Sequence, residues 1–441
     1  MPYIANTDSQ RKAMLQAVGA ASVEELFADI PRRFRTHGLN IPAGISEMEA
    51  LAEMKKLSAR NTDLTCFMGG GFYDHFIPSA VDVITSRSEF YTAYTPYQPE
   101  ASQGTLQAIF EYQSAICRLT GMEVSNASLY DGGTGIFEAV MMAVRLTGRN
   151  RIIVDECVNP IYREMLTCYT RGLHLEIITI DRDGVRTAHT EILKNINNQT
   201  AAVVTQNPNF FGTADDFSDI AEAVHSAGGL LITSVYPISL GILKSPGNMG
   251  ADIVTGEGQS LGLPLSFGGP YLGFLATRKK HVRKMPGRLV GLSSDTKGRR
   301  AFVLTLQARE QHIRREKAAS NICSNEALCA LRAVIYLSLM GKDGLVDTAK
   351  HCAKKTEYLK SLIGHLPEVE VHDVPVFNEF VIDLPISADE VASRMMDKGF
   401  AAGLPLGRYY GNMKDSMLIA VTEKRSAEQI ETFARTLEKI L

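Results

Sequence analysis

The chain contains a tyrosine-rich segment whose residue types could shape a polar binding surface. It runs from Phe90 to Gly104 and includes three tyrosines within its first eight residues. Pro96 and Pro99 exclude a regular helix or a central strand here, because proline fixes φ and lacks an N–H donor. Each tyrosine presents an apolar ring with a polar hydroxyl at its tip. The segment therefore suits either the polar wall of a site or an ordered interface loop without chemistry.

A glycine-rich turn between two short apolar runs is a second candidate wall. The runs are 252–255 and 271–275, and the glycines between them stand at 256, 258, 262, 268 and 269. Glycine permits positive φ and close backbone approach. An irregular segment held between two buried strands is a typical place for binding residues.

Two further groups each allow a functional and a structural interpretation. His75 follows three successive glycines, and it is either an acid or base or a hydrogen-bonded structural residue. Asp131–Gly135 precedes an apolar helical run. Its backbone N–H groups could hold a phosphate near Thr134, but Asp131 disfavours an anion there, and plain capping of the helix is the alternative.

Residues 278–317 form a strongly basic segment. Thirteen Lys and Arg stand against three acidic residues, so the segment carries +10 in a chain of net charge −3. One interpretation is an electrostatic landing surface for an acidic partner. The other is a solvated face with buried arginine pairs at a subunit contact. Interleaved aromatic residues, which a nucleic-acid surface would contain, are missing.

Composition limits the class of protein. The 441 residues are 45% hydrophobic and 22% charged, as in globular proteins long enough for two or three domains. No apolar run approaches the ~18–20 residues of a membrane helix, and the N-terminus has no basic flank and apolar run typical of a signal peptide. The seven scattered cysteines favour reduced thiols in a cytoplasmic protein. The histidines lack metal-binding spacing, so we predict no structural metal.

The pattern of apolar residues predicts an α/β fold behind a helical arm. Residues 1–60 contain two predicted capping boxes, at Ser22 and Ser46. Beyond the arm, short apolar runs alternate with helical stretches, which indicates a mostly parallel sheet covered on both faces. The predicted strands are 151–154, 175–180, 201–204, 230–232, 252–255 and 271–275. Later in the chain, a long helix that starts at Asn321 is predicted to end near Met340-Gly341, and a second helix is predicted over about 345–363.

These segments in combination resemble one enzyme family. They are similar to the P-protein of the glycine cleavage system, the decarboxylating glycine dehydrogenase. The segments that carry the resemblance are Tyr91–Gly104, the turn 256–270, 283–291, 309–321 and the late Val421-Thr422-Glu423. Within that family they resemble subunit 1, the alpha chain of enzymes split into two polypeptides. The resemblance implies a type I PLP-dependent transferase-like fold. It divides the chain into an arm (1–60), a large α/β domain (61–320) and a small α+β domain (321–441).

The chain departs from the catalytic half of the family at two positions. The lysine that forms a Schiff base with pyridoxal phosphate (PLP) is replaced by Ser260, or by Gln259 if the register slips by one. Neither is a primary amine, which an imine requires. The aspartate that pairs with the pyridine nitrogen is replaced by Ser234. The resemblance therefore implies that PLP is bound by the partner subunit rather than by this chain.

The resemblance implies a shared reaction in which glycine is decarboxylated and its aminomethyl group passes to the lipoyl arm of H-protein. The implied partners are subunit 2 (the beta chain), H-protein and glycine, with no nucleic acid and no membrane. The residues expected to contribute across the interface are Thr95, Tyr97, Gln98 and Glu100, with Tyr94, Ser102, Gln103 and His75 in supporting roles. Two alternatives stay open: a non-catalytic scaffold or regulator, and a self-sufficient enzyme that uses a displaced lysine, Lys244 or Lys279.

Overall fold

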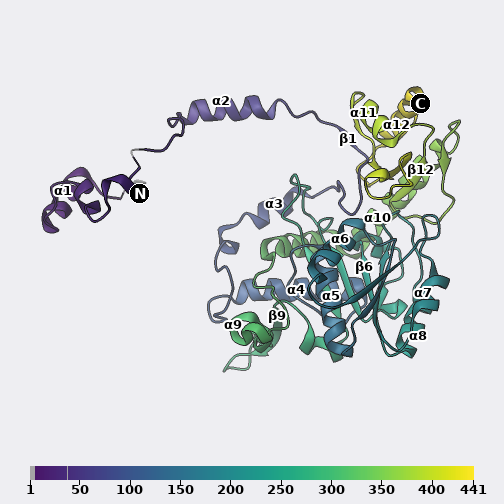
Figure 1. Ribbon diagram of the computed structural model, residues 1–441, viewed down its shortest axis with the longest axis horizontal. Helices are drawn as coiled ribbons and strands as arrows, with labels where there is room; N and C mark the ends of the chain where they lie inside the picture. Colours follow the sequence, from purple (N-terminus) through teal and green to yellow (C-terminus); the bar gives the residue numbers. More distant parts are fainter. Residues whose placement is uncertain (1–4, 37) are drawn as a thin grey trace. The chain divides into compact units, whose positions relative to one another are not determined.

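The computed structural model describes residues 5–36 and 38–441, and the chain divides into two compact units. The first unit comprises residues 1–62 and the second residues 63–441. Figure 1 shows the first unit in purple, with its two helices labelled.

The first unit consists of two α-helices and two 3₁₀ segments. The helices are α1 (Asp8–Ala17) and α2 (Glu47–Ser58), and the 3₁₀ segments are Val23–Phe27 and Arg32–Phe34. The capping box at Ser46 is confirmed, because its hydroxyl accepts from the Glu49 N–H and the Glu49 side chain returns to the Ser46 N–H. The capping box predicted at Ser22 is wrong. The Glu25 carboxylate instead accepts from the N–H of Ala21 (2.7 Å), at a 3₁₀ segment with no α-helix to cap.

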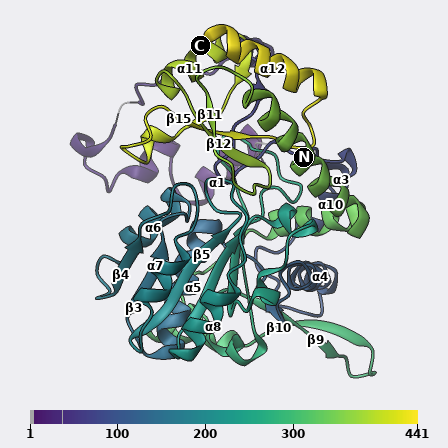
Figure 2. The same ribbon diagram turned by 90° about the vertical axis from the view of Figure 1, so that its right-hand side faces the viewer.

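The second unit is built on a seven-stranded sheet of order β2-β8-β7-β6-β5-β3-β4. β8 is antiparallel to both of its neighbours, and the other neighbouring pairs are parallel. The mostly parallel α/β sheet is therefore confirmed, and Figure 2 shows β3, β4 and β5 side by side. The strands are β2 (Val124–Ser125), β3 (Arg151–Asp155), β4 (Glu176–Ile180), β5 (Thr200–Asn207), β6 (Leu230–Val235), β7 (Ile253–Glu257) and β8 (Gly273–Thr277).

Helices cover both faces of this sheet. Ile152 and Val154 of β3 pack with α5 and α6, while Ile153 between them packs with α7, α8, α4 and α10, because successive strand residues point to opposite faces. The helices of this region are α3 (Ser79–Thr85), α4 (Gln103–Thr120), α5 (Gly132–Thr147), α6 (Pro160–Thr170), α7 (His189–Asn195) and α8 (Ser218–Ser226).

A hairpin carries part of the basic segment. β9 (Leu289–Ser294) and β10 (Arg300–Thr305) pair in antiparallel register, and the short α9 (Gln311–Arg314) follows. The hairpin packs on α4 through Val290 and Phe302. The segment is therefore anchored to the second unit by its apolar side chains.

The C-terminal part contains a four-stranded sheet of order β11-β12-β15-β14. The long helix α10 (Ala327–Ile363) leads into it and is interrupted at Gly341, where φ is 60° and ψ is −168°. The predicted end of one helix near Met340-Gly341 and start of another is thus confirmed. The remaining elements are β1 (Thr65–Cys66), β11 (Glu370–Val371), β12 (Glu379–Asp383), α11 (Ala388–Met396), β13 (Phe400–Ala401), β14 (Leu404–Pro405), β15 (Ser416–Ala420) and α12 (Ala427–Ile440).

The domain boundary at residue 320 stays a prediction. Within the described residues, none of the helices combines the length and apolar character that crossing a bilayer requires.

Candidate functional site

The tyrosine-rich segment is an irregular loop that ends where α4 begins. Gln103, the first residue of α4, fastens the loop to the hairpin. Its side-chain Nε2 donates to the carbonyls of Pro99 and Phe302 (both 2.8 Å), and its Oε1 accepts from the Phe302 N–H (2.9 Å). Gln103 therefore positions the loop with all of its polar side-chain atoms.

Tyr97 lies where the loop meets the basic segment. Its ring makes an edge-on contact with the His312 ring (centroids 5.7 Å apart), and the Arg288 guanidinium lies 5.9 Å from the Tyr97 centroid. Glu310 lies near both side chains, 3.8 Å from Arg288 and 3.6 Å from His312. Three separate stretches of sequence thus converge on one tyrosine.

The polar groups of the loop remain available to a partner. Tyr94 is 80% exposed and Tyr97 48%, and Gln98 and Glu100 are also exposed. In residues 5–36 and 38–441, these four side chains make no hydrogen bond with the rest of the chain. Thr95 and Ser102 are half-buried. We name Tyr94, Tyr97, Gln98 and Glu100 the open surface.

A cavity of about 510 Å³ adjoins the open surface. Its walls come from residues 90–94, from the first turns of α4 and from the start of α10. Aromatic and aliphatic side chains dominate these walls, namely Phe90, Tyr91, Tyr94, Ile109, Leu328 and Leu331.

The glycine-rich turn places Gln259 and Ser260 in the interior. Gln259 is 1% exposed, and its amide accepts from the Tyr73 N–H (3.0 Å) and donates to the carbonyls of Tyr73 (3.1 Å) and Leu263 (2.8 Å). Ser260 is 2% exposed, and its hydroxyl has no partner among the described residues. Gln259 ties the turn to the neighbouring loop, and neither side chain offers an amine.

Ser234 lines a small closed space at the carboxyl ends of the parallel strands. It lies on β6, paired with Gln206 of β5 and Thr255 of β7, and it is 3% exposed. The space measures only about 20 Å³. Its walls are Gly71, Tyr73, Asn159, Tyr162, Gln206, Pro208, Ser234, Val235, Tyr236 and Glu257.

The chain's own carboxylates occupy the start of α5. The Asp131 side chain accepts from the Thr134 N–H (2.7 Å) and from the Thr134 hydroxyl (3.1 Å), as a plain N-cap does. Glu257 accepts from the N–H of Gly132 (3.1 Å). The donors that would have held a phosphate near Thr134 are therefore already in use.

Glu257 is a residue that sequence reasoning missed. Burial raises the pKa of its carboxyl to about 7, although the backbone N–H groups of Leu272, Gly132 and Gln259 stabilise the charged form. Its sequence signal was an acidic residue at the end of an otherwise apolar strand. We name Asp131, Tyr162, Ser234, Glu257 and Ser260 the closed site.

The closed site does not fit pyridoxal phosphate. Positions 259 and 260 offer an amide and a hydroxyl where an imine needs a primary amine. A phosphate at α5 would face two carboxylates. A space of about 20 Å³ holds roughly one water, whereas small-molecule sites usually exceed ~300 Å³.

His75 belongs to a buried hydrogen-bond network. Its Nδ1 lies 2.7 Å from Glu423, and its Nε2 contacts the Tyr236 hydroxyl. Burial raises the pKa of Glu423, but hydrogen bonds from His75 and the Phe76 N–H outweigh it and bring the pKa to about 2. Cys352 also lies within metal-coordinating reach of His75 and Glu423. Both His75 nitrogens already have partners, which favours the structural interpretation, and a role for His75 across an interface stays a prediction.

The two alternative lysines lie away from the closed site. Lys244 is exposed and donates to Asp216 and Ser218 (both 2.9 Å) at the start of α8. Lys279 follows β8, whose last residue, Thr277, pairs with the first residue of β7. It is therefore at the opposite edge of the sheet from Glu257.

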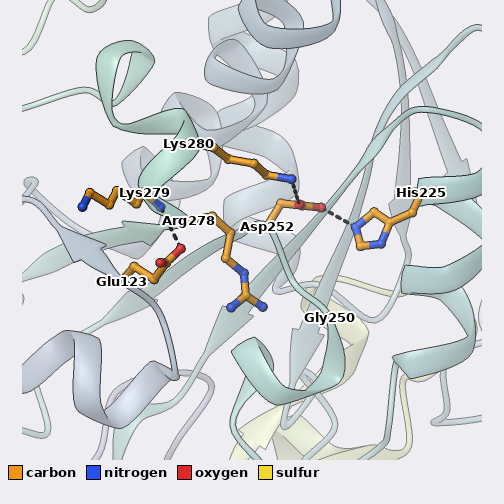
Figure 3. A pocket seen from close by; sticks show the side chains of 7 residues that line it. All are labelled: Glu123, His225, Gly250, Asp252, Arg278, Lys279 and Lys280. Atoms are coloured by element: carbon orange, nitrogen blue, oxygen red, sulfur yellow. Dashed lines mark hydrogen bonds and ion pairs between the residues drawn. The ribbon is translucent and has the colours of Figure 1, made fainter.

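Lys279 adjoins a surface cavity of about 610 Å³ at that opposite edge. There the Asp252 carboxylate accepts from His225 Nε2 (2.7 Å) and lies 3.9 Å from Lys280. Figure 3 shows the Lys279 side chain directed away from Asp252. This arrangement is an ordinary ion-pair cluster and places no amine near the closed site.

The basic segment divides between structural and exposed residues. Ten of its thirteen Lys and Arg are exposed. Arg288 is 6% exposed and donates to the Cys323 carbonyl (2.5 Å) and the Asn325 side chain (3.2 Å), and Arg309 donates to the Gly287 carbonyl (3.0 Å). The exposed cations fit either interpretation, and docking of an acidic partner on them stays a prediction.

Comparisons with known proteins agree on one family. The family model described as "Glycine cleavage system P-protein" matches residues 1–437. The chain is 57% identical to a probable glycine dehydrogenase (decarboxylating) subunit 1 of Geotalea uraniireducens and 51% identical to that of Oleidesulfovibrio alaskensis, with each chain covered in full.

Solved structures agree with this match. An inhibitor-bound glycine decarboxylase (P-protein) of the glycine cleavage system is 42% identical, with a TM-score of 0.93 and full coverage of both chains. A sphingosine-1-phosphate lyase of Burkholderia pseudomallei is 14% identical, with a TM-score of 0.66 over 94% of each chain, and shares the fold alone.

Proposed function

This chain belongs to the glycine cleavage system P-protein family and is a subunit of a heteromeric glycine dehydrogenase, and we propose that it completes a glycine-decarboxylating site carried by its partner subunit. In this proposal the second subunit supplies the lysine and binds pyridoxal phosphate. The present chain supplies a surface that closes and positions that site.

The observation that supports this proposal is the closed site. Glu257 and Asp131 occupy the N–H groups at the start of α5, and serines stand at 234 and 260. Substituting one residue would not make room for the cofactor. The two carboxylates, the small volume and the missing amine each oppose its binding. A chain of this fold without room for the cofactor can serve the reaction only from outside the cofactor's own site.

The open surface is the proposed contribution to the partner's site. Tyr97, Gln98 and Glu100 present polar atoms that the chain itself does not use. Thr95 and Ser102 support them, and Gln103 holds the loop in place through Phe302. At an interface such groups would orient the substrate and exclude water. In cofactor-dependent enzymes the protein contributes this positioning, while the cofactor carries out the chemistry.

The exposed part of the basic segment is a proposed docking surface for H-protein. Its ten exposed cations would speed and orient the encounter with an acidic partner, and the effect would weaken with salt. We also propose a cytoplasmic location, because all seven cysteines are unpaired, as in a reducing compartment.

A labelling experiment tests which of the two subunits binds pyridoxal phosphate. This chain and the lysine-bearing subunit are purified separately and together, supplied with pyridoxal phosphate, and reduced with borohydride. We expect mass spectrometry to find the reduced adduct only on the lysine-bearing subunit, and glycine decarboxylation only in the mixture. An adduct on this chain, together with turnover of glycine by this chain alone, would overturn the proposal.

The second arm of the experiment tests the open surface. Replacing Tyr97 or Gln98 should lower turnover of the assembled enzyme without changing the adduct on the partner. A stable assembly whose turnover is unchanged by both substitutions would instead identify this chain as a scaffold.

A further inference from the structure

Three side chains that can bind a metal ion meet in the interior of the second unit. His75 lies in the loop between β1 and α3, Cys352 on α10, and Glu423 in the loop between β15 and α12. Their ligand atoms all lie within 4.8 Å of one another. We name His75, Cys352 and Glu423 the buried triad. The spacing of histidines along the sequence does not indicate it, because spacing motifs report only ligands that are close in sequence.

The donor types of the buried triad suit zinc. An imidazole nitrogen, a thiolate sulfur and a carboxylate oxygen are the groups that bind Zn²⁺ in proteins, whereas Mg²⁺ and Ca²⁺ prefer oxygen ligands. His75 is 5% exposed and Cys352 0%, so a charge that is not balanced would be costly there. One thiolate and one carboxylate balance the two charges of Zn²⁺ and give a neutral complex.

The distances within the buried triad are close to those of a tetrahedral zinc site. Zn–N and Zn–O bonds of ~2.0–2.2 Å and a Zn–S bond of ~2.3 Å place neighbouring ligand atoms about 3.3–3.6 Å apart. The Sγ of Cys352 lies 3.5 Å from Oε2 of Glu423, which matches this spacing. The Nδ1 of His75 lies 2.7 Å from the same oxygen. These two atoms have to separate by roughly 0.6 Å on binding, which needs only a small side-chain rotation.

Partners on the far side orient two of the three ligands. The second nitrogen of His75, Nε2, contacts the Tyr236 hydroxyl. The second carboxylate oxygen of Glu423, Oε1, accepts from the Phe76 N–H (2.6 Å), and Lys355 donates to the Glu423 backbone carbonyl. Histidines and carboxylates that bind metals usually have such outer partners, which fix their orientation. Nδ1 of the histidine and Oε2 of the carboxylate are therefore the atoms left to face the thiol.

A buried hydroxyl near the buried triad lacks a partner. Tyr336 is 0% exposed, and its hydroxyl has no hydrogen-bond partner within residues 5–36 and 38–441. Burial raises the pKa of Tyr336, and the neighbouring Glu423 and Cys352 raise it further, so the hydroxyl lies within their electrostatic reach. Three protein ligands leave the fourth tetrahedral position to water, and a buried water needs protein partners. Tyr336 offers an unused one.

We propose that the buried triad binds one Zn²⁺ ion through His75 Nδ1, Cys352 Sγ and Glu423 Oε2, with water as the fourth ligand. The Zn–S bond replaces the S–H bond of Cys352, whose proton leaves to solvent. The His75 proton moves to Nε2, which then donates to Tyr236. The ion joins the loop before α3, the long helix α10 and the loop before α12, so its role is structural. The site needs neither the second subunit nor pyridoxal phosphate.

Titration with Co²⁺ tests the ligand set, because a cobalt–thiolate bond absorbs in the near ultraviolet. The full chain is stripped with a chelator and titrated with Co²⁺, and we expect one equivalent to bind with this absorption and to be displaced by Zn²⁺. Cys352→Ser should abolish the thiolate absorption. The matched control, Cys329→Ser, changes another buried thiol of α10 and should keep it. No absorption in the original chain, or absorption that survives Cys352→Ser, would overturn the proposal.

Two further variants keep the proposal testable if Cys352→Ser does not fold. Glu423→Gln keeps the shape of the side chain and removes its charge, so the dissociation constant of Zn²⁺ should rise at least about 100-fold. Tyr236→Phe leaves the three ligands in place and removes the outer partner of His75. The constant should then rise about 10–100-fold, while the thiolate absorption of the cobalt form persists. An unchanged constant in both variants would refute zinc binding at the buried triad.

Thermal unfolding tests the structural role. Zn²⁺ at about 100 times its dissociation constant should raise the melting temperature of the original chain by about 3 °C and leave that of Cys352→Ser unchanged. Equal shifts in both proteins would mean that the ion binds elsewhere, against the proposal. Neither measurement involves the borohydride adduct, so this inference and the proposed function can fail separately.

Discussion

The closed site and the open surface are both built from polar and aromatic residues, yet they treat these residues in opposite ways. In the closed site, Glu257 and Asp131 are bonded to backbone N–H groups of their own chain, and Tyr162 fills the space above the α5 glycines. In the open surface, Tyr94 and Tyr97 point outward without hydrogen-bonding partners among the described residues. The same kinds of residue are thus used within the chain in one region and left free at the surface in the other.

Because of this difference, substitutions in the two regions should affect different properties of the protein. A residue in the closed site should matter to folding and little to chemistry. A residue on the open surface should matter to the assembled enzyme and little to folding.

The largest expected effect is a loss of stability in Tyr162→Ala. Tyr162 is 5% exposed and packs on the glycines at the start of α5, where a Cβ at Gly133 would come within 2.9 Å of its ring. Removing this ring leaves a cavity, and we expect the free energy of unfolding to fall by about 3–5 kcal/mol, measured by urea denaturation.

Tyr94→Ala is the control for Tyr162→Ala. Tyr94 is 80% exposed, so its removal should change the free energy of unfolding by less than about 0.5 kcal/mol. Equal losses in the two variants would contradict the division into closed and open regions.

The second effect concerns the pH dependence of stability. Burial raises the pKa of Glu257 to about 7 in the folded chain, so the folded state binds a proton more tightly than the unfolded state. Stability from this group is present at low pH and is lost as pH rises through about 7. The expected contribution is roughly 3 kcal/mol.

Glu257→Gln should make this pH dependence shallower. Urea denaturation of both chains between pH 5 and pH 8 checks it, because glutamine does not titrate. Glu100→Gln, on the exposed loop, serves as the control and should leave the slope unchanged. If the slope of Glu257→Gln matches that of the original chain, the carboxyl is not held in its neutral form by burial.

The third effect is on turnover. Tyr97→Ala should lower kcat/KM of the assembled enzyme about 10–100-fold, because Tyr97 anchors the loop against His312 and presents its hydroxyl outward. Steady-state glycine decarboxylation and urea denaturation are measured on the same preparations. Tyr97→Phe separates the ring from the hydroxyl. A drop in stability as large as that of Tyr162→Ala would place Tyr97 with the closed site.

The smallest effect tests the displaced-lysine alternative. Lys244→Met removes an exposed ion pair with Asp216 and should cost about 0.5 kcal/mol or less. Turnover of the assembled enzyme should not change. Lys279→Met should behave in the same way, because Lys279 lies at the other edge of the sheet. A tenfold loss of turnover in either variant would reopen that alternative.

Local patterns predicted six of the seven strands of the large sheet. The apolar runs at 151–154 and 201–204 became β3 and β5, and Gly341 interrupts α10 where the sequence indicated a helix end. Capping boxes gave a mixed result, since Ser46 caps α2 and Ser22 caps nothing. The failure has a local cause, because the residues after Ser22 form a short 3₁₀ turn.

The sequence by itself determined what the closed site lacks. Serine stands at 234 and 260, and neither 259 nor 260 carries an amine. Folding does not change these functional groups, so an imine at 259 or 260 is excluded by the sequence alone. The resemblance to the P-protein family likewise rested on residue types and their spacing. Such conclusions need only the order of residues along the chain.

Only the tertiary structure decided which groups bond to the start of α5 and which polar side chains stay free at the surface. Glu257 reaches Gly132 across 125 positions, and Tyr97 meets Arg288 and His312 from a distance of about 200 residues along the chain. The sequence predicts that Gln103 lies at an interface, and only the structure shows that its amide holds the loop to the hairpin. Hydrogen bonds and packing depend on which distant residues meet in space, and that is set by the register of the sheet and the helices on it.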